Sequence, residues 1–365
     1  MLISAAVLRA ADAPYAIEQV QLNFPGPGEV LVKIAGAGLC HTDLLGRSGL
    51  VGLPVILGHE GAGVIEAVGP GVNGLAPGDH VVLTFDSCGT CTNCLAAHPA
   101  YCAEFFPRNL TGVAVDGSTP AADLDGRPVA ARWFGQSSLA SHAIATGRNV
   151  VRVDPGLPLE LLGPLGCGIQ TGAGSVLIAL GVTAGSSIAV FGTGGVGLAA
   201  VMAAAAAGAT QIIAIDLHPG RLDLAAKLGA THTISGTDDD ISSQILAITG
   251  DGAQYSFDTT GVPAVISTAI ASLRPTGTCG LVGITQGDLV LDPFALASGR
   301  NVMGILEGDA VPALFIPRLI DLWQQGRFPF DKLITSYPLG QIGQAEADAA
   351  SGAAVKPVLI PDPLA

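Results

Sequence analysis

A glycine-rich turn between a buried strand and an alanine-rich helix is the feature that most constrains how this chain can fold. Residues 187–191 read as a strand, residues 192–197 follow the pattern G-x-G-x-x-G, and a helix is expected over 198–207. The glycines permit a tight turn and allow a pyrophosphate to approach the N-terminus of the helix. The residues of this turn are Gly192, Thr193, Gly194, Gly195, Val196 and Gly197.

The sequence beyond this turn predicts a doubly wound parallel sheet that binds a dinucleotide. A strand over 211–215 ends at Asp216, about 20 residues after the glycines, as in dinucleotide-binding folds. Asp216 would accept hydrogen bonds from the adenosine ribose and repel a 2′-phosphate, which favours NAD over NADP; a role as a strand-end cap is the weaker interpretation. Further units follow, with a helix over 221–228 and strands over 231–234, 255–258 and 278–282.

The part of the chain before this region has a different character. Short apolar runs alternate with Gly and Pro turns, for example at 25–34 and 63–83, which indicates β-structure. Residues 103–131 are polar and read as a loop, whereas a helix over 311–325 and a strand over 355–360 return to the first domain. At 365 residues the chain suits two domains. We expect a β-rich domain over 1–166 and 305–365, and a nucleotide-binding domain over 167–304.

Cysteine and histidine near residue 40 suggest a metal site. Cys40 and His59 offer the sulfur and nitrogen ligands that zinc prefers, and Cys167 is the best candidate for a third ligand. Two cysteines and one histidine would leave a fourth tetrahedral position open for water or substrate. Taken singly, each residue is better explained as a buried core thiol or a hydrogen-bonded core histidine, and only the motifs further along the chain reverse that preference.

Four further cysteines form a compact cluster with the spacing C-x2-C-x2-C-x7-C. Such spacing lets one loop surround a metal ion with four thiolates, which is typical of a closed, structural zinc site over 88–102. An iron–sulfur cluster also uses four cysteines, but hydride transfer to a dinucleotide needs no such cluster. The four ligands are Cys88, Cys91, Cys94 and Cys102.

Charge and hydropathy exclude some partners. The net charge of −14 argues against nucleic acid or an anionic membrane surface as a partner. Residues 161–215 carry no charged side chain, yet glycines interrupt the run too often for a membrane-spanning helix. The N-terminal residues 1–11 lack the basic start of a signal peptide, so we expect a cytoplasmic protein.

These motifs together resemble the medium-chain, zinc-dependent alcohol dehydrogenase family over essentially the whole chain. The resemblance lies in Cys-His-Thr-Asp at 40–43, Gly-His-Glu at 58–60, the four-cysteine cluster, Cys167 and the glycine-rich turn, in the family's order. Several stretches are similar to the aryl (benzyl) alcohol dehydrogenase branch: 133–138 (WFGQSS), 165–172 (LGCGIQTG), 307–309 (EGD) and 326–333 (GRFPFDKL).

The resemblance implies a role for each matching residue. Cys40, His59 and Cys167 would hold a catalytic zinc ion, with Glu60 just behind it. Asp43 would orient His59, and Thr42 would take the proton of the alcohol. The cofactor contacts implied are His41 and Lys356 at the phosphates, Arg221 beside Asp216 at the ribose, and Thr171 and Val196 at the nicotinamide. Some family members end the proton relay with a histidine where this chain has Leu45.

The resemblance also implies the fold and the reaction. The β-rich domain would be GroES-like, and the second domain would be a Rossmann domain, so the fold class is α/β. The enzyme would bind NAD and two Zn²⁺ ions per chain and move hydride reversibly from a primary aromatic or allylic alcohol to NAD⁺, giving the aldehyde. A polyol dehydrogenase or a glutathione-dependent formaldehyde dehydrogenase is the alternative, and a non-catalytic NAD-binding protein is the weaker one. A homo-oligomer is expected, a dimer rather than a tetramer.

Overall fold

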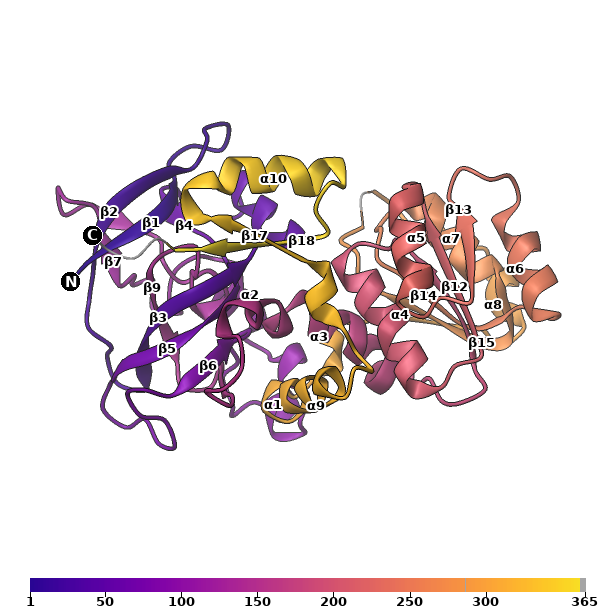
Figure 1. Cartoon of the computed structure of the whole chain (residues 1–365), viewed down its shortest axis with the longest axis horizontal. Helices are drawn as coiled ribbons and strands as arrows, with labels where there is room; N and C mark the ends of the chain where they lie inside the picture. Colours follow the sequence, from indigo (N-terminus) through magenta and orange to yellow (C-terminus); the bar gives the residue numbers. More distant parts are fainter. Residues whose placement is uncertain (286, 362–365) are drawn as a thin grey trace. The chain divides into compact units, whose positions relative to one another are not determined.

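The computed structural model describes residues 1–285 and 287–361, which form two compact units (Figure 1). The first unit contains Met1–Gly168, Val311–Pro317 and Asp331–Ala365, and the second contains Ile169–Ala310 and Arg318–Phe330. The domain boundaries expected from the sequence stay a prediction. The observed units differ from the expected domains mainly near the C-terminus, where residues 318–330 pack with the second unit instead of the first.

Two β-sheets build the first unit. The smaller sheet has the order β4 (Val55–Ile56), β1 (Leu2–Leu8), β2 (Ala16–Leu22), β7 (Ala121–Ala122) and β8 (Pro128–Val129). The larger has the order β10 (Val150–Arg152), β6 (His80–Leu83), β5 (Glu60–Val68), β3 (Glu29–Gly38), β18 (Lys356–Ile360) and β17 (Ile334–Pro338), and β9 (His142–Thr146) also pairs with β3. Side chains that alternate along β1 and β3 pack into two separate core clusters, both rich in valine, leucine, isoleucine and alanine.

The register of the larger sheet brings distant parts of the sequence together. Gly38 at the end of β3 lies opposite both Glu60, the first residue of β5, and Val358 in β18. A Cβ on Gly38 would lie 2.0 Å from Glu60 Oε2, so a side chain there would displace the Glu60 carboxylate. Residues just beyond the ends of β3 and β5 and at the start of β18 are therefore neighbours.

The second unit is a six-stranded parallel sheet. Its order is β13 (His232–Ser235), β12 (Gln211–Asp216), β11 (Ser187–Phe191), β14 (Ala253–Asp258), β15 (Leu273–Leu281) and β16 (Asn301–Gly304). In chain order this is 3-2-1-4-5-6, the doubly wound arrangement of dinucleotide-binding folds. Helices α4 (Gly195–Ala207), α5 (Pro219–Lys227), α6 (Ile241–Thr249) and α7 (Pro263–Ala271) pack on it (Figure 1). The predicted fold class is confirmed.

The remaining helices are mostly short. They are α1 (Thr92–Leu95), α2 (Phe105–Asn109), α3 (Gly168–Gly174), α8 (Pro293–Ala297), α9 (Pro312–Gln324) and α10 (Ile342–Ser351). The stretch 103–131, expected to be a loop, contains α2 and the two short strands β7 and β8. Within the described ranges, no helix combines the length and apolar character needed to cross a membrane.

Candidate catalytic metal centre and nucleotide site

Four donor side chains predicted from separate parts of the sequence meet in the first unit. Cys40 follows β3, His59 precedes β5, Glu60 begins β5, and Cys167 lies just before α3. Their ligand atoms all lie within 4.8 Å of one another. His59, Glu60 and Cys167 are buried, and Cys40 is partly exposed. The fold therefore brings together the three residues that the sequence predicts as zinc ligands, Cys40, His59 and Cys167, with Glu60 beside them.

The donor set fits a zinc ion. The imidazole of His59 is fully buried, and its Nε2 has no hydrogen-bond partner among the described residues. Leaving a buried nitrogen without a partner is costly, which indicates that the atom serves a ligand. Two sulfurs and an imidazole nitrogen are the ligands that zinc prefers. The Thr42 hydroxyl lies 3.7 Å from Cys40 Sγ, beside these donors.

Asp43 fixes the other side of the His59 ring. Its Oδ1 lies 2.8 Å from His59 Nδ1, and both side chains are fully buried. Its Oδ2 accepts a hydrogen bond of 3.0 Å from the amide of Cys40. One carboxylate therefore contacts the ring of His59 and the backbone of Cys40; the resemblance implied the contact with His59, and the role of orienting a metal ligand stays a prediction.

Electrostatics at the centre favour a thiolate beside the imidazole. Hydrogen bonding with Cys167 lowers the pKa of the Cys40 thiol well below its ordinary value. Burial acts in the opposite direction, and the charge of His59 lowers the pKa further. Burial lowers the pKa of His59, but the charges of Asp43 and Cys40 outweigh burial and raise it well above its ordinary value. A divalent cation bound among these groups would neutralise the negative charge of the Cys40 thiolate in the same way.

The loop 133–138 surrounds His59. The Phe134 ring stacks on the imidazole, with ring centroids 4.3 Å apart. Gln136 Nε2 donates to the carbonyl oxygen of His59 at 2.9 Å, and Gln136 Oε1 accepts from the amide of Gly61 at 3.1 Å. Trp133 Nε1 donates to Asp43 Oδ1 at 3.0 Å. The ring, the backbone and the carboxylate partner of His59 are therefore all contacted from one loop.

Glu60 and Lys356 form a buried ion pair behind the ligands. Lys356 Nζ lies 2.9 Å from both carboxylate oxygens, and the amide of Gly168 donates to Glu60 Oε1 at 3.0 Å. Burial raises the pKa of Glu60, although Lys356 opposes the shift. Burial lowers the pKa of Lys356, but the charge of Glu60 outweighs it and raises the pKa above its ordinary value. In this structure Lys356 is committed to Glu60, whereas the resemblance placed it at the cofactor phosphates; that contact stays a prediction.

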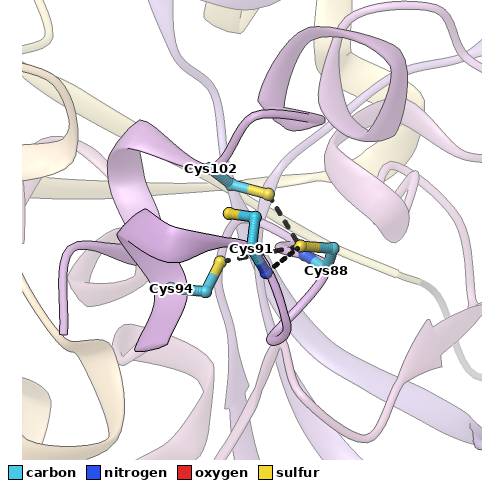
Figure 2. A group of neighbouring side chains, drawn as sticks. All are labelled: Cys88, Cys91, Cys94 and Cys102. Carbon is cyan, nitrogen blue, oxygen red and sulfur yellow. Dashed lines mark hydrogen bonds between the residues drawn. The ribbon is translucent and has the colours of Figure 1, made fainter. Parts of the chain in front are cut away.

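The four-cysteine cluster is the second donor group (Figure 2). The sulfurs of Cys88, Cys91, Cys94 and Cys102 lie within 4.8 Å of one another around α1. Backbone amides of Thr90 and Cys91 donate to Cys88 Sγ at 3.4 and 3.2 Å and lower the pKa of its thiol to about 6. Burial instead raises the pKa of Cys102 to about 12. Four sulfurs at this separation fit one zinc ion and leave no open position.

The glycine-rich turn in the second unit has the geometry that a dinucleotide requires. Gly192 has φ +86°, and a Cβ on Gly197 would lie 1.8 Å from the carbonyl oxygen of Gly192, so both positions need glycine. A Cβ on Gly194 would meet no described atom within 4 Å. Gly194 caps α4 without a side-chain hydrogen bond, so the first amides of the helix are open to an anion.

Asp216 ends β12 next to this turn and is largely buried. Its Oδ2 accepts from the amide and the hydroxyl of Thr193 at 2.6 and 2.9 Å, and its Oδ1 accepts from the amide of His218 at 2.9 Å. Asp216 thus stabilises the turn itself, a role that the sequence interpretation had set aside. Contact with a ribose stays a prediction.

The other expected cofactor residues are placed as follows. Arg221 lies in the first turns of α5, and Val196 lies in the first turn of α4. Thr171 is in α3, and its hydroxyl donates to Glu307 Oε2 at 3.5 Å. In the first unit, the exposed His41 begins the 3₁₀-helix 41–47, and Leu45 packs against the apolar core.

Sequence reasoning missed several contacts around the centre. Trp133, Phe134 and Gln136 were singled out only as part of a resembling stretch, and the Lys356–Glu60 pair was not anticipated. A buried tryptophan–phenylalanine pair has the composition of ordinary core, so composition carries no signal of its contacts. Phe134 and Ser137 have positive φ, +50° and +52°, which is uncommon for such residues and marks the loop only once the backbone is known.

Comparison with known proteins agrees with this geometry. Residues 26–155 match the family described as alcohol dehydrogenase GroES-like domain, and residues 195–324 match the family described as zinc-binding dehydrogenase. The chain belongs to the medium-chain, zinc-dependent alcohol dehydrogenase family. Alcohol dehydrogenase activity follows from this membership, with small-molecule alcohols as substrates.

Individual relatives cover nearly the whole chain. The geraniol dehydrogenase of Castellaniella defragrans is 48% identical over 98% of this chain and 97% of its own length. A crystal structure of an alcohol dehydrogenase zinc-binding domain protein from Burkholderia ambifaria has a TM-score of 0.97 and 51% identity, covering 99% of both chains. That of benzyl alcohol dehydrogenase from Acinetobacter calcoaceticus has a TM-score of 0.95 and 41% identity, over 99% of this chain and 100% of its own.

Proposed function

We propose that this protein transfers hydride reversibly from a primary aromatic or allylic alcohol to NAD⁺ and releases the aldehyde, with a zinc ion held by Cys40, His59 and Cys167. The observation that carries the proposal is the fully buried His59 Nε2, which has no partner among the described residues and lies in a group of two sulfurs and a carboxylate. The Thr42 hydroxyl adjoins the same group.

The chain's own residues would orient the alcohol and move its proton. Zinc in this site would supply a Lewis acid that lowers the pKa of the substrate hydroxyl. Thr42 Oγ1 would accept the hydroxyl proton and pass its own proton on, because a hydroxyl both donates and accepts. The hydride leaves the carbinol carbon for the nicotinamide ring, so one proton is released for each hydride transferred. Because Leu45 has no exchangeable proton, the proton must reach solvent by a route that does not include this side chain.

The names of two relatives support an unsaturated substrate. The relatives that are 48% and 41% identical to this chain are named for geraniol, an allylic alcohol, and for benzyl alcohol, an aromatic one. Conjugation also stabilises the aldehyde product.

Asp216 supports the choice of NAD. Its carboxylate lies at the end of β12, where an acid hydrogen-bonds ribose hydroxyls in dinucleotide-binding folds and repels a 2′-phosphate. The second unit would hold the NAD, within the proposed domain 167–304. The proposed zinc domain, 1–166 and 305–365, would hold both zinc ions, one at Cys40 and one in the cluster 88–102.

We also propose a homodimer. The edge strand β16 of the parallel sheet is short, and Val290 and Phe294 near it are 82% and 85% exposed. Large exposed apolar side chains near a free strand edge favour contact with a second copy. Light scattering coupled to size-exclusion chromatography measures the mass of the protein in solution. If the wild type is a dimer and the Phe294→Asp variant is a monomer, Phe294 lies in the contact between the two copies.

The test of substrate class is a steady-state screen with NAD⁺. Benzyl alcohol, cinnamyl alcohol and geraniol are compared with ethanol, sorbitol and the formaldehyde adduct of glutathione. We expect the highest kcat/KM for the first three. A higher kcat/KM for sorbitol or the glutathione adduct would assign the alternative activities, and no turnover of any alcohol would favour a binding protein.

A further inference from the structure

We propose that Trp133 is a positioning residue for the metal ligand His59 and that it acts through Asp43. The inference rests on the proposed zinc site at Cys40, His59 and Cys167. It adds a tryptophan from a distant loop to the hydrogen-bonded chain that orients the imidazole.

Three N–H groups converge on a single oxygen atom. Asp43 Oδ1 lies 3.1 Å from the amide of Gly58, 2.8 Å from His59 Nδ1 and 3.0 Å from Trp133 Nε1. Asp43, His59 and Trp133 are each 0% exposed, so no solvent competes for these contacts. The indole therefore fixes the position and the lone-pair direction of the oxygen that fixes His59.

The indole is itself rigidly held. The amide of Trp133 donates to Ser137 Oγ at 2.9 Å, and that hydroxyl donates to the carbonyl oxygen of Ile56 at 2.6 Å. Phe134, Gly135 and Ser137 have φ of +50°, +66° and +52°. A loop that keeps two non-glycine residues in this uncommon conformation is one that the surrounding contacts over-determine.

A core-filling role for Trp133 is the competing explanation. A phenylalanine at 133 would fill much of the same space but has no N–H group to donate. If Trp133 only fills space, removing the N–H changes stability and leaves the metal site unaffected. If Trp133 positions His59 through Asp43, the metal site changes, because partners behind a metal ligand affect how tightly the metal is bound.

The first experiment needs no turnover. The chain has two tryptophans, so the ¹H–¹⁵N spectrum of the purified protein labelled on tryptophan contains two indole signals. Trp323→Phe assigns the Trp133 signal. We expect this signal to resist exchange in D₂O and to shift in Asp43→Asn, while the Trp323 signal stays in place. An unchanged Trp133 signal in Asp43→Asn, or rapid exchange in the wild type, would overturn the proposed contact.

The second experiment measures the metal site in Trp133→Phe. The rate of zinc loss to a chelator is followed in wild type, Trp133→Phe and Trp323→Phe, and the kinetic phase missing from Cys40→Ala is assigned to the His59 site. We expect this phase to be roughly tenfold faster in Trp133→Phe. The cobalt-substituted protein should show shifted ligand-field bands for the same variant. Trp323→Phe, which removes an indole from the other unit, should match the wild type in both measurements.

Each result has a distinct meaning. Zinc loss and cobalt bands that are unchanged in Trp133→Phe would overturn the positioning role while leaving the zinc site intact. A wild type without zinc at Cys40 would instead refute the proposed function. Should Trp133→Phe fail to fold, Asp43→Asn and the exchange rate of the Trp133 indole in the wild type decide the question.

Discussion

At the scale of a single residue, removing the hydroxyl of Thr42 tests its proposed role in the proton relay. Thr42→Ala removes the hydroxyl beside the Cys40 sulfur that would take the alcohol proton, whereas Thr42→Ser retains it. We expect hydride transfer in a single turnover to fall roughly 100-fold or more in the alanine variant, as for loss of a general base, and to survive in the serine variant. Leu45→His should leave the step unchanged or modestly faster. Near-normal hydride transfer in Thr42→Ala would refute the relay.

His41 separates cofactor binding from proton transfer. Its side chain is exposed and next to Thr42 in the chain, so it is placed either for a cofactor phosphate or for a relay to solvent. We expect His41→Ala to weaken NAD⁺ binding and to leave the single-turnover hydride step normal. A large loss in that step, with NAD⁺ affinity little changed, would instead place His41 in the relay.

At Asp216, substitutions can separate the observed contacts with the glycine-rich turn from the proposed selection of NAD. Asp216→Ala removes the charge that would repel a 2′-phosphate, so the ratio of kcat/KM for NAD⁺ to that for NADP⁺ should fall. It also removes the hydrogen bonds to Thr193 and His218, so the turn should loosen. Asp216→Asn removes the charge but keeps an acceptor, and should relax the preference with a smaller loss of stability. Equal use of both cofactors by the wild type would refute the proposed NAD preference.

At the scale of an element, the proposed zinc ion of the four-cysteine cluster would stabilise a lobe whose central helix buries no side chain. Around it, α1 has no buried residue. A structural metal contributes folding free energy directly, so Cys91→Ala should lose one zinc ion and lower the Tm by roughly 5 °C or more. Cys279→Ala, which removes a buried thiol from β15, is the control and should keep the full metal content. A Cys91→Ala protein as stable as the wild type would contradict a structural role.

Across the whole molecule, the two metal groups predict two zinc ions per chain with separable effects. Metal analysis of freshly purified protein should find close to two zinc ions per chain. Cys40→Ala should lose one zinc ion and all turnover but keep the Tm close to that of the wild type, because the catalytic site lies on strands that the core already holds. One zinc ion per chain in active wild type would count against the zinc ion of the cluster, and none would count against both sites.

The sequence by itself determined the features that depend on neighbouring residues. Strand β11 was predicted with the bounds found, Ser187–Phe191. Its apolar run is followed directly by the glycine-rich turn and the alanine-rich helix, so local sequence marks where the strand ends. The cluster 88–102 was predicted as a metal site because its ligands lie within one loop, and the family's order of motifs indicated Cys40, His59 and Cys167 as partners.

Only the tertiary structure decided the contacts that join distant segments. Gly38 faces both Glu60 and Val358 through sheet register, which brings Lys356 to Glu60. Trp133 reaches Asp43 across 90 residues because the loop that carries it has a backbone conformation that no local pattern encodes. Such contacts depend on how whole strands align and how the core packs. Local periodicity determines neither the alignment of strands nor the packing of the core. A slip of one residue in register would exchange the two faces of a strand without changing its sequence pattern.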